Sequence, residues 1–495
     1  MKRSKFNLTH DVKMSCNMGK LIPIACMEAL PGDVFSHSSD MLLRTAPLLA
    51  PVMHKVDADI RHFFVPNRLV WDNWQDFITG GEDGDNSSVP PYVAIPSGGF
   101  AVGSLADYLG LPTTVAAGTH VSAMPFRAYN LIFNQWYRDE DLVNKRAVVK
   151  TDGLDTTTDL TLASAAWEKD YFTRARPTPQ KGPDVLLPLA GVAPINVSAT
   201  TGVRGKFMKA SDHSGLGGTA INSNGSSEMV DASGTVGALY NPNGTLYADL
   251  TDATAVDVND LRVALALQRY EEDNSRFGNR YDEFLLNNFG IKSQDARLQL
   301  PEYLGGGRQT IQFSEVLQTS ASDDEQPLGQ LGGHGISTMR SNRYRKMVPE
   351  HGWIISVLVV RPKTAYQQGI HKQFSRVTKE DYFDKHFANL GQQEILNKEI
   401  YAAAASPDAV FGYIDRYEEY RTVVSRVAGD FRDDLDFWHM GRIFSSAPAL
   451  NADFVTSSPT TRIYAVTEAD PLWIYVRNNV VARRVVPKFA KPLTF

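Results

Sequence analysis

The side chains of this 495-residue chain that could do chemistry are mainly acidic pairs and scattered histidines. Asp57 and Asp59 are spaced like a metal-binding pair, and the three aspartates at residues 433–436 could form an acid–base cluster. Catalysis or metal binding requires such groups to converge with further ligands, a base or a nucleophile, and no local signature of such a set is present. We expect Asp57 and Asp59 on the solvent face of a strand, and the later cluster on a solvated surface beside Arg432.

Other candidate motifs are incomplete. The glycine-rich stretch 305–308 lacks the Lys-Ser/Thr of a phosphate-binding loop, so it is expected to form a turn. The loop 83–88 lacks the glycine and glutamate of a calcium-binding loop. His371 and His386 are too far apart to be interpreted as a ligand pair. The sequence therefore predicts no catalytic residue, no metal site and no cofactor.

The remaining feature with a possible function is the distribution of charged residues, which could bind nucleic acid. The 50 basic and 56 acidic residues give a net charge of −6, so the chain as a whole does not attract nucleic acid. Basic residues gather at both ends, and from residue 477 onward no acidic residue occurs, while Phe489 and Phe495 are interleaved. A basic segment with aromatics can follow a phosphate backbone while bases stack. The alternative is a terminal strand whose cations pair with acidic neighbours. The DNA-facing candidates are Arg477, Arg483, Arg484, Lys488 and Lys491, with Lys2, Arg3 and Lys5 at the other end.

Length and composition describe an ordinary globular protein. Hydrophobic residues make up 43% and charged residues 21%, in a chain long enough for two or three domains or one large β domain. The two cysteines, Cys16 and Cys26, are too few for a disulfide framework and are expected to be free, buried thiols. No secretory signal and no run of about 18 apolar residues is found, so neither secretion nor a membrane span is predicted.

Strand patterns are spread over the whole chain. Residues 56–61 alternate apolar and charged, residues 352–360 form an apolar run, and residues 472–477 alternate again. Further strands are predicted at 310–314, 423–427 and 462–466. Helices are few and are predicted at 104–110, 125–136, 261–270, 281–288 and 378–390. Many strands separated by long connections with single helices indicate an antiparallel barrel or sandwich with elaborate loops.

The segment 187–256 differs in composition. It has ten glycines, no tryptophan and only three aromatic residues, so it cannot bury much apolar surface alone. Residues 238–240 and 245–247 flank Asn-Pro-Asn-Gly, which predicts a hairpin. One interpretation is a flexible linker. We prefer a projecting insertion that becomes ordered by packing against other copies of the chain.

An aromatic block stands out between residues 63 and 77. It combines five aromatic side chains with a turn-setting proline, a composition suited to packing and anchoring. Candidates for subunit interfaces or packing are Phe63, Phe64, Trp71, Trp74, Phe77, Trp136 and Trp438.

This block resembles a segment of the major capsid proteins of the gokushovirus branch of the Microviridae. Residues 125–140, 351–355, 364–369, 411–421 and 434–439 are similar to the same family, in the same order. The resemblance covers most of 20–140 and 260–445. It implies an eight-stranded antiparallel jelly-roll with long inserted loops, assembled as sixty copies. The implied parts are an N-terminal arm (1–19), the first part of the jelly-roll (20–186), a threefold protrusion (187–256), and the rest of the jelly-roll with its basic tail (257–495).

The resemblance also implies partners and a location. They are other copies of the chain, a circular single-stranded DNA genome, a small basic DNA-binding protein, an internal scaffolding protein and a minor DNA pilot protein. The protein is expected in the virion, after assembly in the bacterial cytoplasm. A host cell-surface receptor is predicted to bind the tip of the insertion, at Tyr240, Asn241, Asn243 and Tyr247. The competing class is a carbohydrate-binding or other adhesive β-sandwich. An enzyme ranks third, because distant residues can assemble a site without a local motif.

Overall fold

The computed structural model describes residues 3–183, 185, 258–278, 280–317 and 331–489, together with six three-residue strands between 195 and 248. The chain divides into two compact units, Met1–Pro179 with Asn274–Phe495, and Gln180–Asp273. We call the first unit the body and the second the inserted unit. Strands form the framework of the body, so the protein is mainly β, as predicted.

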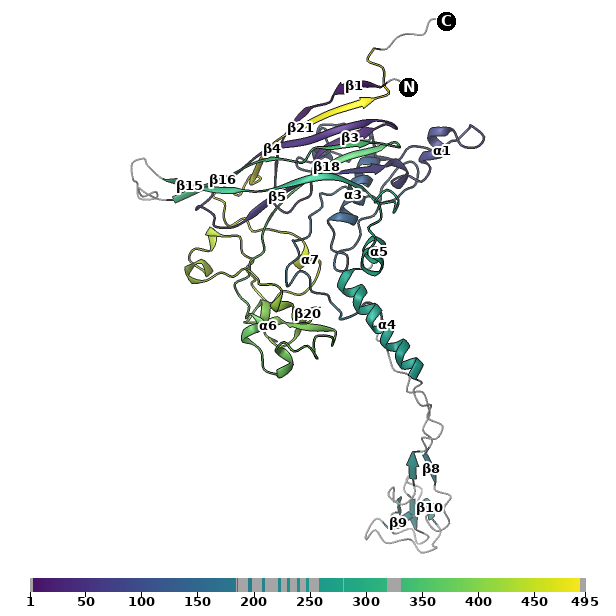
Figure 1. Ribbon diagram of the computed structural model, residues 1–495, viewed down its shortest axis with the longest axis vertical. Helices are drawn as coiled ribbons and strands as arrows, with labels where there is room; N and C mark the ends of the chain where they lie inside the picture. Colours follow the sequence, from purple (N-terminus) through teal and green to yellow (C-terminus); the bar gives the residue numbers. More distant parts are fainter. Residues whose placement is uncertain are drawn as a thin grey trace. The chain divides into compact units, whose positions relative to one another are not determined.

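Two antiparallel sheets build the body (Figure 1). The larger sheet has the order β1-β21-β4-β16-β15, with β2 also on β21 and β17 also on β4. Its strands are β1 (Ser4–Asn7), β2 (His10–Cys16), β4 (Val34–Thr45), β15 (Gln312–Leu317), β16 (Leu331–Arg340), β17 (Tyr344–Met347) and β21 (Leu472–Arg484). The smaller sheet has the order β14-β5-β18-β3, formed by β14 (Glu302–Thr310), β5 (Val56–Pro66), β18 (Gly352–Pro362) and β3 (Ile22–Ala29).

The core between the sheets follows from strand periodicity. Val56, Ala58 and Ile60 of β5 share one face and pack in the same cluster as Leu43 of β4 and Val476 of β21. Successive side chains on a strand point to opposite faces, so the intervening residues of β5 point away from the larger sheet. The sandwich core is therefore made by alternate residues of strands that are far apart in the sequence.

The other face of the smaller sheet is covered by α3 (Met124–Trp136). Phe126, Tyr129 and Phe133 of α3 pack in one cluster with Val357 and Val359 of β18. The aromatic residues recur at helical spacing, so they form one face that buries against the sheet. The body consequently has three layers: the larger sheet, the smaller sheet, and α3 with its neighbouring loops.

The structure overturns the expectation that Asp57 and Asp59 face solvent. Asp57 is only 6% exposed and accepts hydrogen bonds from Arg308 and Thr310, each at 2.5 Å. Burial alone would raise the pKa of Asp57, but these hydrogen bonds and the nearby cations lower it. Asp59 pairs with Arg61 at 2.8 Å. The charged positions of the alternating strand are thus covered and neutralised by arginines.

A buried ion pair joins α3 to the loop that follows it. Arg127 Nε lies 2.7 Å from Asp155 Oδ2, and neither side chain is exposed. The guanidinium also donates to the carbonyl oxygens of Val70 and Thr151, at 3.0 and 3.1 Å. Because the remaining donors have partners, the pair avoids the cost of an incompletely bonded buried charge.

Two buried histidines contact each other between the sheets, with their rings tilted by 56°. His37 of β4 and His62 of β5 have ring centroids 4.6 Å apart and are fully buried. His37 Nε2 lies 3.4 Å from Asn478 Oδ1, which can only accept, so His37 Nδ1 accepts from the Tyr344 hydroxyl at 3.1 Å. His62 contacts serine hydroxyls at 2.7 and 3.0 Å. Burial lowers the pKa of both rings, so they are neutral members of a polar network inside the sandwich.

Four predicted helices are present: α2 (Leu105–Tyr108), α3, α4 (Val258–Phe277) and α5 (Tyr281–Phe289). The helix predicted at 378–390 is wrong. Only the 3₁₀ turn η3 (Lys379–Asp381) forms, and Tyr382 after it is extended. Phe383 instead packs edge-on against Tyr417, with ring centroids 5.3 Å apart, and this tertiary contact overrides the helical spacing.

Two predicted strands are also wrong. Residues 423–427 and 462–466 make only isolated bridges, of Arg426 with Tyr366 and of Tyr464 with Leu48. The strand predicted at 310–314 spans a junction instead. β14 ends at Thr310 in the smaller sheet and β15 begins at Gln312 in the larger one, so the chain changes sheets at Ile311.

The hairpin predicted around residues 241–244 is not formed by the strands that flank it. β12 (Ala238–Tyr240) pairs with β9 (Phe207–Lys209), and β13 (Leu246–Ala248) pairs with β8 (Ile195–Val197). The third pair of the inserted unit is β10 (Ile221–Ser223) with β11 (Met229–Asp231). Short elements of the body are β6 (Tyr92–Ala94), β7 (His120–Ser122), β19 (Gln392–Leu396), β20 (Val410–Asp415), α1 (Trp74–Thr79), α6 (Asn397–Ile400) and α7 (Ala452–Val455).

Candidate nucleic-acid interface

The outer face of the larger sheet is exposed and basic. The residues of β21 that point away from the core begin with Trp473, Tyr475 and Arg477 and continue to Arg483. Direct partners in an antiparallel sheet share a face, so the register identifies their neighbours. Lys5 lies opposite Arg483, and Lys13 lies opposite Tyr475. We call this surface the outer sheet face.

Basic strand residues outnumber acidic ones on the outer sheet face. The acidic residues are Asp11 and Asp40, each opposite Arg477 on one of its two neighbouring strands. The basic residues are Lys5, Lys13, Arg44, Arg340, Arg345, Arg477 and Arg483. The seven cations and two carboxylates give the strand residues of this face a net charge of +5, in a chain whose net charge is −6. The Asp470 carboxylate lies beside them and accepts a hydrogen bond from Ser15. A concentrated positive field on one face attracts polyanions that the whole molecule does not.

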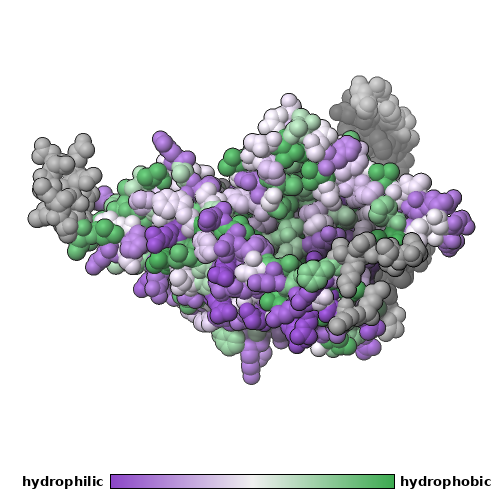
Figure 2. All heavy atoms as spheres, turned by 90° about the horizontal axis from the view of Figure 1, so that it is seen from above, coloured by the Kyte–Doolittle hydropathy of each residue, from purple (hydrophilic) through white to green (hydrophobic). Residues whose placement is uncertain are grey.

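Aromatic and polar groups accompany these cations. Trp473 is 46% exposed and lies opposite Arg44, and the Tyr475 phenol lies two residues further along β21. The pKa of Tyr475 is raised, by desolvation first and then by the Asp11 carboxylate that accepts its hydrogen bond. Arg340 Nε pairs with Asp40 Oδ1 at 3.2 Å, with both side chains largely in solvent. Seen from above, the protein shows hydrophilic side chains over much of its surface, with hydrophobic ones between them (Figure 2).

The structure separates the predicted DNA-facing residues. Arg477, Arg483 and Lys5 lie together on the outer sheet face. Arg484 instead pairs with the buried Asp33 at 2.8 Å, so it holds the sheet edge together. Arg3 and Lys488 are exposed near the two ends of the described chain, and Lys2 and Lys491 lie outside the described residues.

Four cations of the outer sheet face escaped the sequence analysis: Lys13, Arg44, Arg340 and Arg345. Lys13, Arg44 and Arg340 each follow an apolar residue of a strand, and this alternation was the available signal, whereas Arg345 stands beside Lys346 and has no such signal. Alternation alone does not say which strands are neighbours. The basic surface is created by the pairing of β1, β2 and β4 with β21, and of β16 and β17 with β4.

The predicted packing aromatics fall into two groups. Phe63, Phe64 and Trp71 are at most 1% exposed, so they belong to the core of the subunit itself. The remaining four are half-buried or exposed and could contact a neighbour: Trp74, Phe77, Trp136 and Trp438.

The residues of the predicted receptor tip are only partly described. Tyr240 and Tyr247 lie on β12 and β13, and Asn241 and Asn243 lie outside the described residues.

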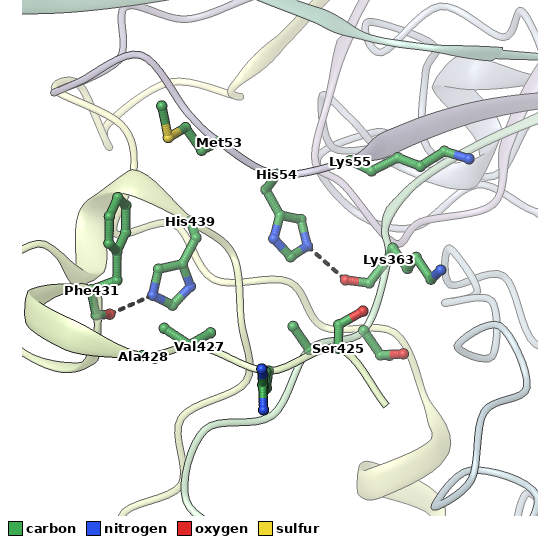
Figure 3. A pocket seen from close by; sticks show the side chains of 12 residues that line it. Met53, His54, Lys55, Lys363, Ser425, Val427, Ala428, Phe431 and His439 are labelled. Atoms are coloured by element: carbon green, nitrogen blue, oxygen red, sulfur yellow. Dashed lines mark hydrogen bonds between the residues drawn. The ribbon is translucent and has the colours of Figure 1, made fainter. Parts of the chain in front are cut away.

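A pocket of about 350 Å³ in the body has two histidines but no catalytic arrangement (Figure 3). His54 Nε2 donates to the Lys363 carbonyl at 2.6 Å, and His439 Nε2 donates to the Phe431 carbonyl at 2.7 Å. His439 Nδ1 accepts from the Gly441 amide at 2.9 Å, so this ring is fully bonded. Burial lowers the pKa of His54, and the Lys363 carbonyl only partly offsets it. Both rings serve as structural links between loops.

Within the ranges that the structure describes, no group of three metal-ligating side chains is found, and no helix is long and apolar enough to cross a membrane.

Comparison with known proteins gives a consistent result. Residues 1–494 match the model of the family described as capsid protein (F protein). Capsid protein VP1 of Bdellovibrio phage phiMH2K is 41% identical over 484 residues, covering 94% of this chain and 90% of that protein. Capsid protein VP1 of Chlamydia phage 1 is 34% identical, covering 99% and 96%, and that of Spiroplasma virus 4 is 32% identical, covering 99% and 95%.

These relatives are structural proteins of Microviridae, as the sequence resemblance indicated, which favours a capsid protein over an adhesive β-sandwich or an enzyme. Because the family model spans almost the whole chain and these phage proteins align with it nearly end to end, the chain belongs to the family of F-type phage capsid proteins and is a component of the virion.

Proposed function

We propose that this protein assembles in sixty copies into an icosahedral shell around a circular single-stranded DNA genome, with the outer sheet face against the DNA. Membership of the capsid family supports self-assembly. The two packed antiparallel sheets of the body support an eight-stranded jelly-roll with long inserted loops. In a closed shell each contact can be weak, because many are made at once.

The assignment of the DNA-facing surface rests on the uneven distribution of charge over the protein. The strand residues of the outer sheet face carry a net charge of +5, whereas the chain as a whole has −6. Phosphate groups bind to such a surface by displacing counterions, and exposed aromatic rings such as Trp473 can stack on unpaired bases. No sequence-specific contact is needed, which suits a surface that must accept an entire genome.

The net negative charge also bears on the other partners. A shell of subunits at −6 each cannot neutralise its genome, so a separate small basic DNA-binding protein has to supply charge. We further propose an internal scaffolding protein and a minor DNA pilot protein as partners.

We also propose that the inserted unit forms a threefold protrusion whose tip, near Tyr240 and Tyr247, binds the host receptor. The low aromatic content of segment 187–256 supports a protrusion that is ordered only where copies meet.

A triple variant tests the DNA-facing surface. Replacing Lys5, Arg477 and Arg483 with Gln removes three cations from the outer sheet face without opening a core position. Binding to a thymidine oligonucleotide, measured by fluorescence anisotropy over a range of NaCl concentrations, should weaken. The slope of log K against log salt should become shallower by about 2, at roughly 0.7 per lost single-strand phosphate contact.

The matched control replaces three exposed cations elsewhere, Arg297, Lys379 and Lys385, with Gln. This control should keep the parent slope, since it removes the same charge from other surfaces. An equal loss in both variants would refute the assignment of the outer sheet face. Light scattering of the parent, expressed with its phage companions, tests the shell separately: a protein that stays a small oligomer would contradict the sixty-copy assembly whatever its DNA affinity.

A further inference from the structure

Arg280 docks the start of α5 on the end of α3. Its Nη1 donates to the Gln135 carbonyl at 2.8 Å, and its Nη2 donates to the carbonyls of Asn134 and Arg138, both at 3.3 Å. The last carbonyls of a helix lack partners within the helix and carry partial negative charge, so a guanidinium is well placed there. Residues almost 150 positions apart are joined at this point.

Two glutamates meet at the same guanidinium. Glu140 Oε2 lies 3.4 Å from Arg280 Nε, and Glu283 Oε1 lies 3.9 Å from Arg280 Nη1. Glu283 Oε2 also accepts from the Arg280 amide at 3.4 Å, which caps the first turn of α5. The two carboxyl groups are neighbours, and a proton on one of them lets it donate a hydrogen bond to the other. Both stand over Gly278, where a Cβ would clash with Glu283 Oε2 and lie 3.5 Å from Glu140 Oε2.

A hydrogen bond between two carboxyl groups requires a proton, because two carboxylates offer only acceptors. Arg280 supplies one positive charge, which it shares with three carbonyl groups. Asp282, on the first turn of α5, adds negative charge and accepts from Gln135 Nε2 at 3.3 Å. The other charged groups beside this joint are Arg138, Asp139 and Asp141. Asp139 and Asp141 have their own cations in Lys169 and Arg176.

We propose that Glu140 and Glu283 form a proton-dependent latch, which holds the start of α5 against the end of α3 while the pair shares one proton and loosens when both ionise. Arg280 is the fixed part of the latch, because its charge does not change near neutral pH. The pair is the switchable part, since ionisation replaces its hydrogen bond with repulsion between two carboxylates.

The ionisation falls in an accessible pH range. Burial first, and then the neighbouring Glu140, raise the pKa of Glu283 to about 7. In the closed state α5 is held against α3, and in the open state it is released. Between a pH equal to the ordinary glutamate pKa and about pH 7, the closed state therefore binds more protons than the open state. Its stability is fully present at low pH and is lost as the pH rises through 7. From pH 6 to pH 8 the open fraction should increase about tenfold.

Hydrogen exchange of the full-length protein tests this latch. Protection of α5 amides, corrected for the intrinsic pH dependence of exchange, should fall about tenfold from pH 6 to pH 8. Glu283→Gln and Glu140→Gln should each keep the pH 6 protection at pH 8, because a carboxamide donates the hydrogen bond without a titrating proton. Glutamine also preserves the capping of α5. Glu283→Ala, which cannot form the bond, should show low protection at both pH values.

Glu302→Gln is the matched control, since Glu302 pairs with Lys346 in another part of the body. It should retain the parent's tenfold change. The latch is refuted if parent protection of α5 is equal at pH 6 and pH 8, or if the two Gln variants lose protection as the parent does.

Discussion

The buried histidine pair predicts a loss of stability in mild acid. His37 and His62 are fully buried, and among the described residues their hydrogen-bond partners include no carboxylate. Burial lowers the pKa of His37 from 6.5 to about 4, because the Asn478 hydrogen bond only partly compensates and the nearby His10 lowers it further. The pKa of His62 is lowered by burial and by His37. Charging either ring inside the sandwich is therefore unfavourable.

The size of the effect follows from the pKa difference. Above pH 6.5 the ring is neutral in both the folded and the unfolded chain, so stability does not depend on it. Between pH 6.5 and about pH 4 the unfolded chain binds a proton at this ring and the folded chain does not. The free energy of unfolding therefore decreases as the pH falls through this window. The shift for His37 corresponds to about 3 kcal/mol over this whole window, of which about 2 kcal/mol is lost by pH 5. His62 adds to the loss in the same direction.

The assay is urea unfolding of the unassembled protein at pH 7, 6 and 5. In His37→Gln the titrating group is gone, so the free energy of unfolding should change between pH 7 and pH 5 by about 2 kcal/mol less than in the parent. The quantity compared is the change of the unfolding free energy with pH in each protein. A constant cost of the substitution does not affect this change, and the contribution of the carboxylates is the same in both proteins. His386→Gln, at an exposed histidine, is the control and should keep the parent slope. An unchanged slope in His37→Gln would refute the reasoning.

Two further predictions concern the ion pair and the tip. Arg127→Met should destabilise the body by about 3–5 kcal/mol, because the buried Asp155 carboxylate loses its cation and keeps only the hydrogen bonds from Thr157 and Thr158. Arg345→Met, at an exposed position, should leave the thermal midpoint almost unchanged, and an equally small effect of Arg127→Met would contradict the prediction. Deleting residues 241–244 should abolish adsorption to host cells while particles of normal size still form, and normal adsorption would exclude the tip as the receptor site.

Local sequence patterns predicted much of the framework. The alternation in β5, the apolar run of β18 and the aromatic spacing of α3 each gave the correct element, because each pattern reports a single element against a single apolar layer. The same reasoning failed at residues 378–390, where the packing of Phe383 on Tyr417 overrides the helical spacing. It also failed at Asp57, because the pattern of one strand does not reveal that Arg308 and Thr310 of a neighbouring strand bind its carboxylate.

The sequence by itself determined the mainly β class, the family and the lack of a local catalytic motif. Only the tertiary structure decided which charges meet. The outer sheet face draws cations from strands separated by more than 400 residues, and its charge depends on their register, since a shift by one residue would turn every side chain to the opposite face. The joint of Glu140 with Glu283 likewise exists because α5 docks on the end of α3. Electrostatic sites of this kind depend on distances of a few ångströms between remote segments, and no local pattern encodes those distances.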